Sequence, residues 1–306
     1  MPPHKDLALR HRVNADVTDF FVSRGFLQVE TPALVPCPGL DVHLDAFEAK
    51  TSHAARYLAT SPEYQMKRLL ADGHMRVFQI SKCFRRGELG SRHNPEFTML
   101  EWYRAPGTMA DTMSETEQLV ARVTGGAVHL GDRTINTLPP FARMPLREAF
   151  ERYASVSEHA FFDMAENDED AFFRILVDQV EPSIAELNHA VFITEYPVQQ
   201  ASLARPDPRD PRVAERYELY IAGIELCNGF GELTDADEQR ARFEQDREER
   251  RLRGLDVYPL DEKFLSALEL GIPACSGNAL GMDRLAALAL GTTEIGRVMS
   301  FTADEL

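Results

Sequence analysis

Residues 75–103 contain two strand-like stretches on either side of a charged segment, and this pattern constrains the fold most. Residues 75–80 and 98–103 are rich in apolar and aromatic side chains, which is typical of strands. The segment between them contains two glycines, which favour turns. The pattern therefore predicts a β-hairpin that places Arg85 and Glu101 on neighbouring strands, where both can face one cleft.

The hairpin concentrates arginines, carboxylates and aromatic rings within residues 84–103. The arginine fork is well shaped for bidentate contact with phosphate. Carboxylates beside it suit an ammonium group or a divalent metal ion. The segment therefore predicts a site where a polyphosphate and a cationic small molecule meet.

The chain has 306 residues, enough for a sizeable core in one large domain or two small ones. Its four cysteines are far apart and form no CxxC pair, which favours a reducing cytosol over a disulfide framework or a zinc site. No apolar run approaches the roughly 18 residues of a membrane span, and the first six residues have no apolar signal core. We therefore expect a cytoplasmic protein that does not enter a membrane.

The net charge of −16 opposes binding to a polyanion. A protein that grips an RNA backbone usually presents a basic face. The overall charge therefore argues against tRNA as a partner, although a local basic patch remains compatible with it. The acidic run at 163–170 is interpreted as a solvated surface segment and not as a metal site.

Hydrophobic periodicity and turn residues predict further elements. A helix is expected at 7–24, followed by a strand at 26–30 that ends at Thr31 and Pro32. The remaining expectations are helices at 108–124, 141–153 and 235–253, a strand at 217–226 that is broken at 227–230, and an exposed loop at 204–212. The loop is interpreted as a connector, with a mobile lid as the alternative.

Three separated segments resemble the three motifs of class II aminoacyl-tRNA synthetases. Residues 25–32 resemble motif 1, residues 84–103 resemble motif 2, and residues 277–285 resemble motif 3, a glycine-rich strand that leads into a helix. This resemblance implies an α+β fold with an antiparallel sheet flanked by helices, and one catalytic domain over 1–306. Within the class, residues 93–103 and 225–233 most resemble lysyl-tRNA synthetases.

Motif 1 begins near the start of the chain, which leaves no room for the anticodon-binding barrel that precedes it in lysyl-tRNA synthetases. In this respect, and in residues 61–70 and 200–204, the chain resembles the elongation factor P lysine ligases, stand-alone paralogues of the synthetase core. The resemblance implies activation of β-lysine or lysine with ATP and Mg²⁺, and transfer of the aminoacyl group to elongation factor P. It also implies a homodimer formed through motif 1.

The same resemblance assigns residues to ATP and Mg²⁺. Arg85 would clamp the α-phosphate and Arg284 the γ-phosphate, and Glu218 and Glu225 would bind the metal ion. The two glutamates are seven residues apart, a spacing that straddles both faces of a strand unless a bulge intervenes. The other residues assigned to ATP are Arg86, Gly87, Glu88, Asn94, Phe97, Leu226 and Gly281. Glu88 is displaced by one position from the acidic residue that the synthetases carry in motif 2.

Acidic residues are expected around the amino acid because an ammonium group buried without carboxylate partners is costly. Ala279 stands where lysyl-tRNA synthetases usually have glycine, and alanine is the residue expected in the ligases. His93 is interpreted as a loop anchor, with a proton carrier as the alternative. The residues assigned to the amino acid are Ser61, Pro62, Glu63, Glu101, Tyr103, Asn228, Phe230, Glu232 and Ala279.

Three other functions remain open from the sequence. A truncated synthetase would charge tRNA, but the acidity of the chain and the missing anticodon module argue against it. A non-catalytic protein that binds lysine or ATP would be expected to have lost its phosphate clamps. An enzyme that amidates a small molecule such as aspartate would not need an acidic pocket.

Overall fold

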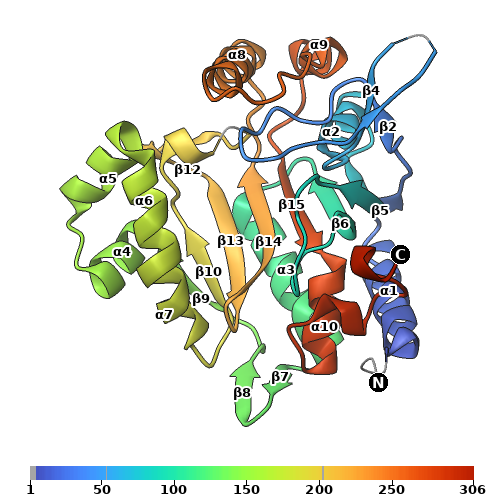
Figure 1. Cartoon of the computed structure of the whole chain (residues 1–306), viewed down its shortest axis with the longest axis vertical. Helices are drawn as coiled ribbons and strands as arrows, with labels where there is room; N and C mark the ends of the chain where they lie inside the picture. Colours follow the sequence, from blue (N-terminus) through green and yellow to red (C-terminus); the bar gives the residue numbers. More distant parts are fainter. Residues whose placement is uncertain (1–4, 53, 202) are drawn as a thin grey trace.

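The computed structural model describes residues 5–52, 54–201 and 203–306. An eight-stranded sheet forms its centre, with antiparallel pairing between the six inner strands and a parallel pair at each edge. The strands follow the order β1 (Leu27–Gln28), β5 (Arg76–Phe84), β6 (Glu96–Arg104), β15 (Ser276–Gly281), β14 (Ile224–Gly231), β13 (Arg216–Ile221), β10 (Val191–Thr194) and β9 (Ala142–Pro145). The predicted α+β fold with a largely antiparallel sheet is confirmed (Figure 1).

Three helices pack on one face of this sheet: α1 (Leu7–Val22), α3 (Met109–Thr124) and α10 (Met282–Leu290). Phe21 of α1 stacks on Phe78 of β5 with ring centroids 5.0 Å apart and also contacts Trp102 of β6. The predicted helices at 7–24 and 108–124 are confirmed, and Thr108 caps the second one in a capping box with Asp111. This apolar layer leaves the opposite face of the sheet for polar side chains.

Strand register determines which residues share that opposite face, because successive side chains of a strand point to opposite sides. Glu101 pairs with Ala279, Ala279 with Asn228, and Asn228 with Glu218. We call these four residues the central row. A second row on the same face, two residues further along, consists of Tyr103, Gly277, Phe230 and Arg216. Neighbouring residues of the same strands, such as Leu100 and Leu280, belong to the helix-packed core.

Two further groups of helices flank the sheet (Figure 1). At the β9–β10 edge lie α4 (Leu146–Ala154), α5 (Glu158–Asn167), α6 (Glu169–Ile175), a π-helical turn (Leu176–Val180) and α7 (Glu181–Ala185). On another side lie α2 (Glu63–Ala71), α8 (Ala236–Leu252) and α9 (Glu262–Leu270), where Tyr64 stacks on Phe264 at 4.8 Å. The acidic run 163–170 covers the end of α5 and the start of α6.

Short elements complete the chain. Two small sheets pair β2 (Leu34–Val35), β4 (Arg56–Leu58) and β3 (Glu48–Ala49), and β7 (Ala127–Leu130) with β8 (Arg133–Asn136). The 3₁₀ turns are Val198–Gln200, Ile295–Arg297 and Ala303–Glu305.

The helix predicted at 141–153 was placed too early. Residues 142–145 form strand β9 beside β10, and the helix begins only at Leu146. Pro145 lies at this boundary, where a proline can end a strand and precede a helix. The loop predicted at 204–212 was also wrong in part. It contains the hairpin of β11 (Pro206–Asp207) and β12 (Asp210–Ala214).

The strand predicted at 217–226 is two strands. β13 ends at Ile221, the chain turns at Ala222 and Gly223, and β14 continues through the residues that were expected to break it. The turn was missed because it carries apolar residues and a single glycine. The predicted helix at 235–253 is confirmed as α8, with Asp235 as its N-cap. Ser202, part of the segment at 200–204 that resembles the ligases, lies outside the described residues.

Candidate active site

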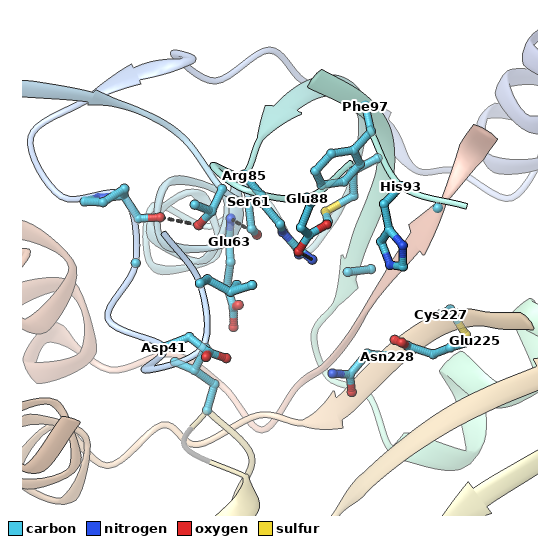
Figure 2. A pocket seen from close by; sticks show the side chains of 18 of the residues that line it. Asp41, Ser61, Glu63, Arg85, Glu88, His93, Phe97, Glu225, Cys227 and Asn228 are labelled. Carbon is cyan, nitrogen blue, oxygen red and sulfur yellow. Dashed lines mark hydrogen bonds and ion pairs between the residues drawn. The ribbon is translucent and has the colours of Figure 1, made fainter. Parts of the chain in front are cut away.

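A cavity of about 290 Å³ lies against the polar face of the main sheet. Its wall combines the hairpin β5–β6, strands β14 and β15, the start of α2, residues of the segment 37–44, and Gln200, Ala201 and Leu203. Figure 2 shows Arg85, Glu88, Phe97 and His93 on one side, with Glu225 and Asn228 opposite. The predicted residues in the wall are Ser61, Glu63, Arg85, Glu88, Asn94, Phe97, Glu225, Leu226, Asn228, Phe230, Ala279, Gly281 and Arg284.

Arg85 follows directly after β5 and is held by its neighbours in the hairpin. Its guanidinium lies 5.0 Å from the centre of the Phe97 ring and 3.6 Å from the Glu88 carboxylate. Gly87 has a φ of +88°, a conformation that favours glycine, and it forms the turn between Arg85 and Glu88. Among the described residues, the buried Nε of Arg85 has no hydrogen-bond acceptor. This donor is therefore available to an anion such as a phosphate.

Arg284 lies in the first turns of α10 and reaches across to β14. It donates to the backbone carbonyl of Glu225 at 2.7 Å, and its Nη2 lies 2.8 Å from Nε2 of His93. Burial, and next the nearby Arg284, lower the pKa of His93 below its usual value. A neutral imidazole can accept a hydrogen bond from the guanidinium. This contact favours the interpretation of His93 as an anchor, here for Arg284.

Glu218 and Glu225 lie on different strands of the β13–β14 hairpin, whose register shifts between Leu219 and Tyr220. The Glu225 side chain lines the cavity and is 42% exposed; partial loss of water around its carboxylate, reinforced by the charge of Glu218, raises its pKa above the usual value. Glu218 lies outside the cavity wall and is already bonded. Its two carboxylate oxygens accept from Arg216 at 2.5 Å and from the hydroxyls of Tyr196 and Tyr220 at 2.6 and 2.8 Å.

Arg216 is a cavity residue that the sequence interpretation missed. It lines the wall, bonds Glu218 and stacks over the Tyr196 ring at 4.4 Å. It lies two residues before Glu218 on β13, so strand alternation places both on the same face. That spacing was the available signal. With Arg92, which also lines the wall, the cavity thus contains four arginines: Arg85, Arg92, Arg216 and Arg284.

The acidic residues assigned to the amino acid already hold an ammonium group from the chain itself. Lys67 of α2 is 1% exposed, and its Nζ lies 2.6 Å from Glu63 and 2.5 Å from Glu232. Opposite charges at these distances raise the pKa of Lys67 above its usual value, against the effect of burial. Glu232 therefore lies beneath the cavity, outside its wall, with Lys67 as its partner.

Glu101 and Tyr103 also lie beneath the wall, next to this ion pair. Glu101 accepts hydrogen bonds from the Tyr103 hydroxyl at 2.6 Å and from the Ser61 hydroxyl at 2.9 Å. Burial, and next the charge of Glu63, raise the pKa of Glu101 to about 8. Burial also raises the pKa of Glu232 to about 7. The acidic cluster therefore binds protons readily while its carboxylates lack further cations.

Two buried acceptor atoms near the amino-acid end of the cavity have no hydrogen-bond donor within the described part of the chain. Among the described residues, Oδ1 of Asn228 and Oε1 of Glu232 are buried without a hydrogen-bond donor. An unpaired buried acceptor is costly. Both atoms are acceptors, so an ammonium group is the kind of ligand that would satisfy them.

Four other assigned residues occupy different positions from those expected. The Arg86 guanidinium lies outside the wall, at the outer rim, because it pairs there with the Asp256 carboxylate at 2.7 Å. Gly87 and Pro62 also lie outside the wall, in a turn and at the start of α2. Asn94 lines the wall, but its amide donates to the Glu96 carbonyl and accepts from the Ala303 N–H, so its polar atoms secure the loop.

Comparisons with known proteins identify the family of the chain. The family model for tRNA synthetases class II (D, K and N) matches residues 3–305. The chain belongs to that family. It is 42% identical to the elongation factor P–(R)-β-lysine ligase of Klebsiella pneumoniae subsp. pneumoniae, over 99% of this chain and 96% of that protein. It is 41% identical to the ligase of the same name from Salmonella paratyphi B, over 98% and 95%.

The described residues also bear on membranes and metals. None of their helices combines the length and apolar character that crossing a membrane requires. Within the same residues, no group of three or more histidine, cysteine, aspartate or glutamate side chains is arranged to hold a metal ion.

Proposed function

We propose that this class II synthetase family member activates (R)-β-lysine, or lysine, with ATP and transfers it to a lysine of elongation factor P. The carboxylate of the amino acid attacks the α-phosphorus of ATP, and pyrophosphate leaves. The acceptor amine then attacks the acyl carbon of the adenylate, loses a proton and releases AMP. The names of the relatives, which cover nearly the whole chain, support this substrate pair.

The cationic end of the cavity fits the phosphates of ATP. Arg85 offers an unpaired Nε, and Arg284 is held toward the cavity by His93 and by the Glu225 carbonyl. Fixed cations of this kind stabilise the charge that develops on transferring phosphates. Phe97, already beneath the Arg85 guanidinium, provides a ring on which the adenine can stack.

Glu225 fits a Mg²⁺ ion, because magnesium commonly takes one or two carboxylates and completes its shell with phosphate and water. When bound, the ion would neutralise phosphate charge. Glu225 would hold it, and Glu218 would remain behind Arg216 as a second carboxylate that supports the negative potential there. A raised pKa is expected for a carboxylate at a cation site while no cation is bound, and Glu225 shows this shift.

The acidic end of the cavity fits the ammonium groups of the amino acid. The observation that carries the proposal is the pair of buried acceptors without donors, Asn228 Oδ1 and Glu232 Oε1, next to Glu101 and Glu63. These atoms need hydrogen-bond donors, which an ammonium group supplies and the carboxylate side chain of aspartate does not. Ala279, between Glu101 and Asn228 in the central row, sets the depth available above the sheet.

The proposal extends to the cellular setting. We propose a cytoplasmic homodimer in which residues 1–306 act as one catalytic domain. tRNA would not be its acceptor, because a net charge of −16 opposes a polyanion.

ATP–pyrophosphate exchange with lysine, (R)-β-lysine and aspartate tests the first step. Exchange is expected with at least one lysine isomer and not with aspartate. Arg85→Ala should reduce exchange by at least about 100-fold, which is the scale for one charge-stabilising donor. Intact mass of elongation factor P after incubation tests the second step. Absence of exchange with both lysine isomers would refute the enzymatic proposal, and charging of tRNA without a mass gain would favour a synthetase.

A further inference from the structure

We propose that helix α8 is a clamp that holds two segments of the cavity rim, and that Arg250 and Arg242 are its positioning residues. The first rim is residues 39–45, and the second consists of Ala201, Leu203 and Ala204. Both contribute residues to the cavity wall. The expected changes in KM and kcat rest on the function proposed above, whereas the expected changes in amide hydrogen exchange do not.

Arg250 is completely buried although it lies near the end of a highly charged helix. Its Nη1 lies within 3.1 Å of the backbone carbonyls of Asp41, Val42 and Leu44. Its Nη2 donates to the Asp45 carboxylate at 2.7 Å. The remaining Nε donates to the carbonyl of Asp256 at 2.6 Å. One side chain therefore fixes a whole loop through its main chain.

Aromatic and backbone contacts complete the support of the first rim. The Arg250 guanidinium stacks over the Tyr258 ring at 4.6 Å, and the Tyr258 hydroxyl accepts a hydrogen bond from the Ala46 N–H at 2.8 Å. The carbonyl of Asp45 accepts from the N–H of Arg86 at 2.7 Å. Since Arg86 follows Arg85 directly, the loop is also tied to the hairpin that carries the phosphate site.

Arg242 makes the corresponding contacts with the second rim. Its Nη1 donates to the carbonyls of Ala201 and Ala204 at 2.8 and 2.9 Å. Arg242 and Arg250 lie about two helical turns apart on α8. Figure 1 shows α8 beyond the ends of β13 and β14. A single rigid helix therefore holds both rims at once.

Both rims adjoin the amino-acid end of the cavity. The first rests on the segment before α2, where the Thr60 hydroxyl donates to the Pro38 carbonyl at 2.5 Å, next to Ser61 and Glu63. The second runs beside Glu232, since Leu233 donates to the Leu203 carbonyl at 3.0 Å. If the rims were loose, the substrate would have to order them when it binds, and that ordering weakens affinity. The clamp should therefore act on KM for the amino acid more than on kcat.

Arg250→Lys tests the clamp in the full-length protein. Lysine keeps the charge but lacks the planar fork that reaches three carbonyls and a carboxylate together. Hydrogen exchange of the amides at 41–46 should accelerate at least tenfold while the core strands stay protected. KM for the amino acid in ATP–pyrophosphate exchange should rise about tenfold, with kcat within about twofold. Arg242→Lys should accelerate exchange of the amides of Ala201, Leu203 and Ala204 and leave 41–46 unchanged.

Arg251→Lys is the matched control, because Arg251 is the next residue of α8, is exposed, and pairs locally with Glu248. It should change neither measurement. If Arg250→Lys does not fold, Tyr258→Phe removes only the acceptor of Ala46 and should give a smaller change, about threefold in KM, in the same direction.

The clamp would be overturned if amide hydrogen exchange at 41–46 were unchanged in Arg250→Lys. If that variant does not fold, the same result in Tyr258→Phe would overturn it. So would a uniform loss of protection with a fall in kcat alone, since that is the signature of general destabilisation. A wild-type protein with no ATP–pyrophosphate exchange would refute the proposed function instead. The amide comparison would still decide whether Arg250 orders the rim.

Discussion

Replacing Lys67 with methionine should destabilise the protein in a way that depends strongly on pH. Lys67 is 1% exposed and lies within 2.6 Å of Glu63 and Glu232, so its removal leaves two carboxylates without their cation. Removing one partner of a buried ion pair costs about 3–5 kcal/mol. That cost applies in full only at a pH high enough to keep Glu232 ionised.

A lower pH should relieve part of this loss. The pKa of Glu232 is already raised to about 7, and it should rise further without Lys67. A carboxylate that takes up a proton no longer needs the cation, and each pH unit of that linkage corresponds to about 1.36 kcal/mol. Between pH 8 and pH 6 the penalty should therefore fall by up to about 1.4 kcal/mol, because below pH 7 Glu232 is protonated in the wild-type protein as well.

Urea unfolding monitored by the fluorescence of Trp102 can measure both values. Trp102 is the single tryptophan of the chain and is fully buried. The protein concentration must be the same in all samples, because an oligomer would make stability depend on it. Lys82→Met is the control, since Lys82 pairs with Glu96 at 3.2 Å on the surface, where a pair contributes at most about 1 kcal/mol. A loss below 1 kcal/mol at pH 8 for Lys67→Met, or a loss that does not change with pH, would refute the reasoning.

Two further substitutions probe the same region. Glu101→Gln mimics the protonated carboxyl group. The folded protein holds a proton on Glu101 up to about pH 8, whereas the unfolded chain releases it near 4.5, so Glu101 lowers the stability of the wild-type protein as the pH rises between these values. The stability of the variant should lack this pH dependence. Thermal unfolding at pH 6 and 8.5 measures this pH dependence, and an equal dependence in the wild type and the variant would contradict the argument. In ATP–pyrophosphate exchange, KM of the variant for the amino acid should rise at least about tenfold. Gly277→Ala places a Cβ against the Tyr103 ring and 2.6 Å from Glu232 Oε1, so it should cost about 1–3 kcal/mol of stability and remove amino-acid binding. Gly281→Ala, whose Cβ meets only ordinary contacts at 3.4 Å or more, is the control for unfolding midpoints, and equal midpoints would argue against the overlap.

The parts of the site that follow from local pattern were predictable from the sequence. The hairpin at 75–103 and the strand–helix unit at 277–285 bring Arg85 and Arg284 to one cavity, and both units are specified by residues close together in the chain. The family resemblance supplied Glu225. Only the meeting of the two units depends on residues that are remote in the sequence, since β6 pairs with β15.

Lys67 and Arg250 could not be predicted in the same way. Glu63 and Lys67 are four residues apart on a helix, the usual spacing of a surface ion pair, and only the distant Glu232 reveals that the pair is buried. Arg250 lies in a run of charged residues in which its neighbours are exposed. Its five donors are satisfied by carbonyls and a carboxylate that lie elsewhere in the chain, so no local pattern distinguishes it.

The central row has a consequence for how such an enzyme can change its substrate. Glu101, Ala279, Asn228 and Glu218 come from four strands, and the residues next to them in each strand belong to the opposite, helix-packed face. Recognition and folding are thus assigned to alternate positions of the same strands. A substitution at Ala279 can reshape the pocket floor with little effect on the core, whereas a one-residue insertion would exchange the two roles and abolish both.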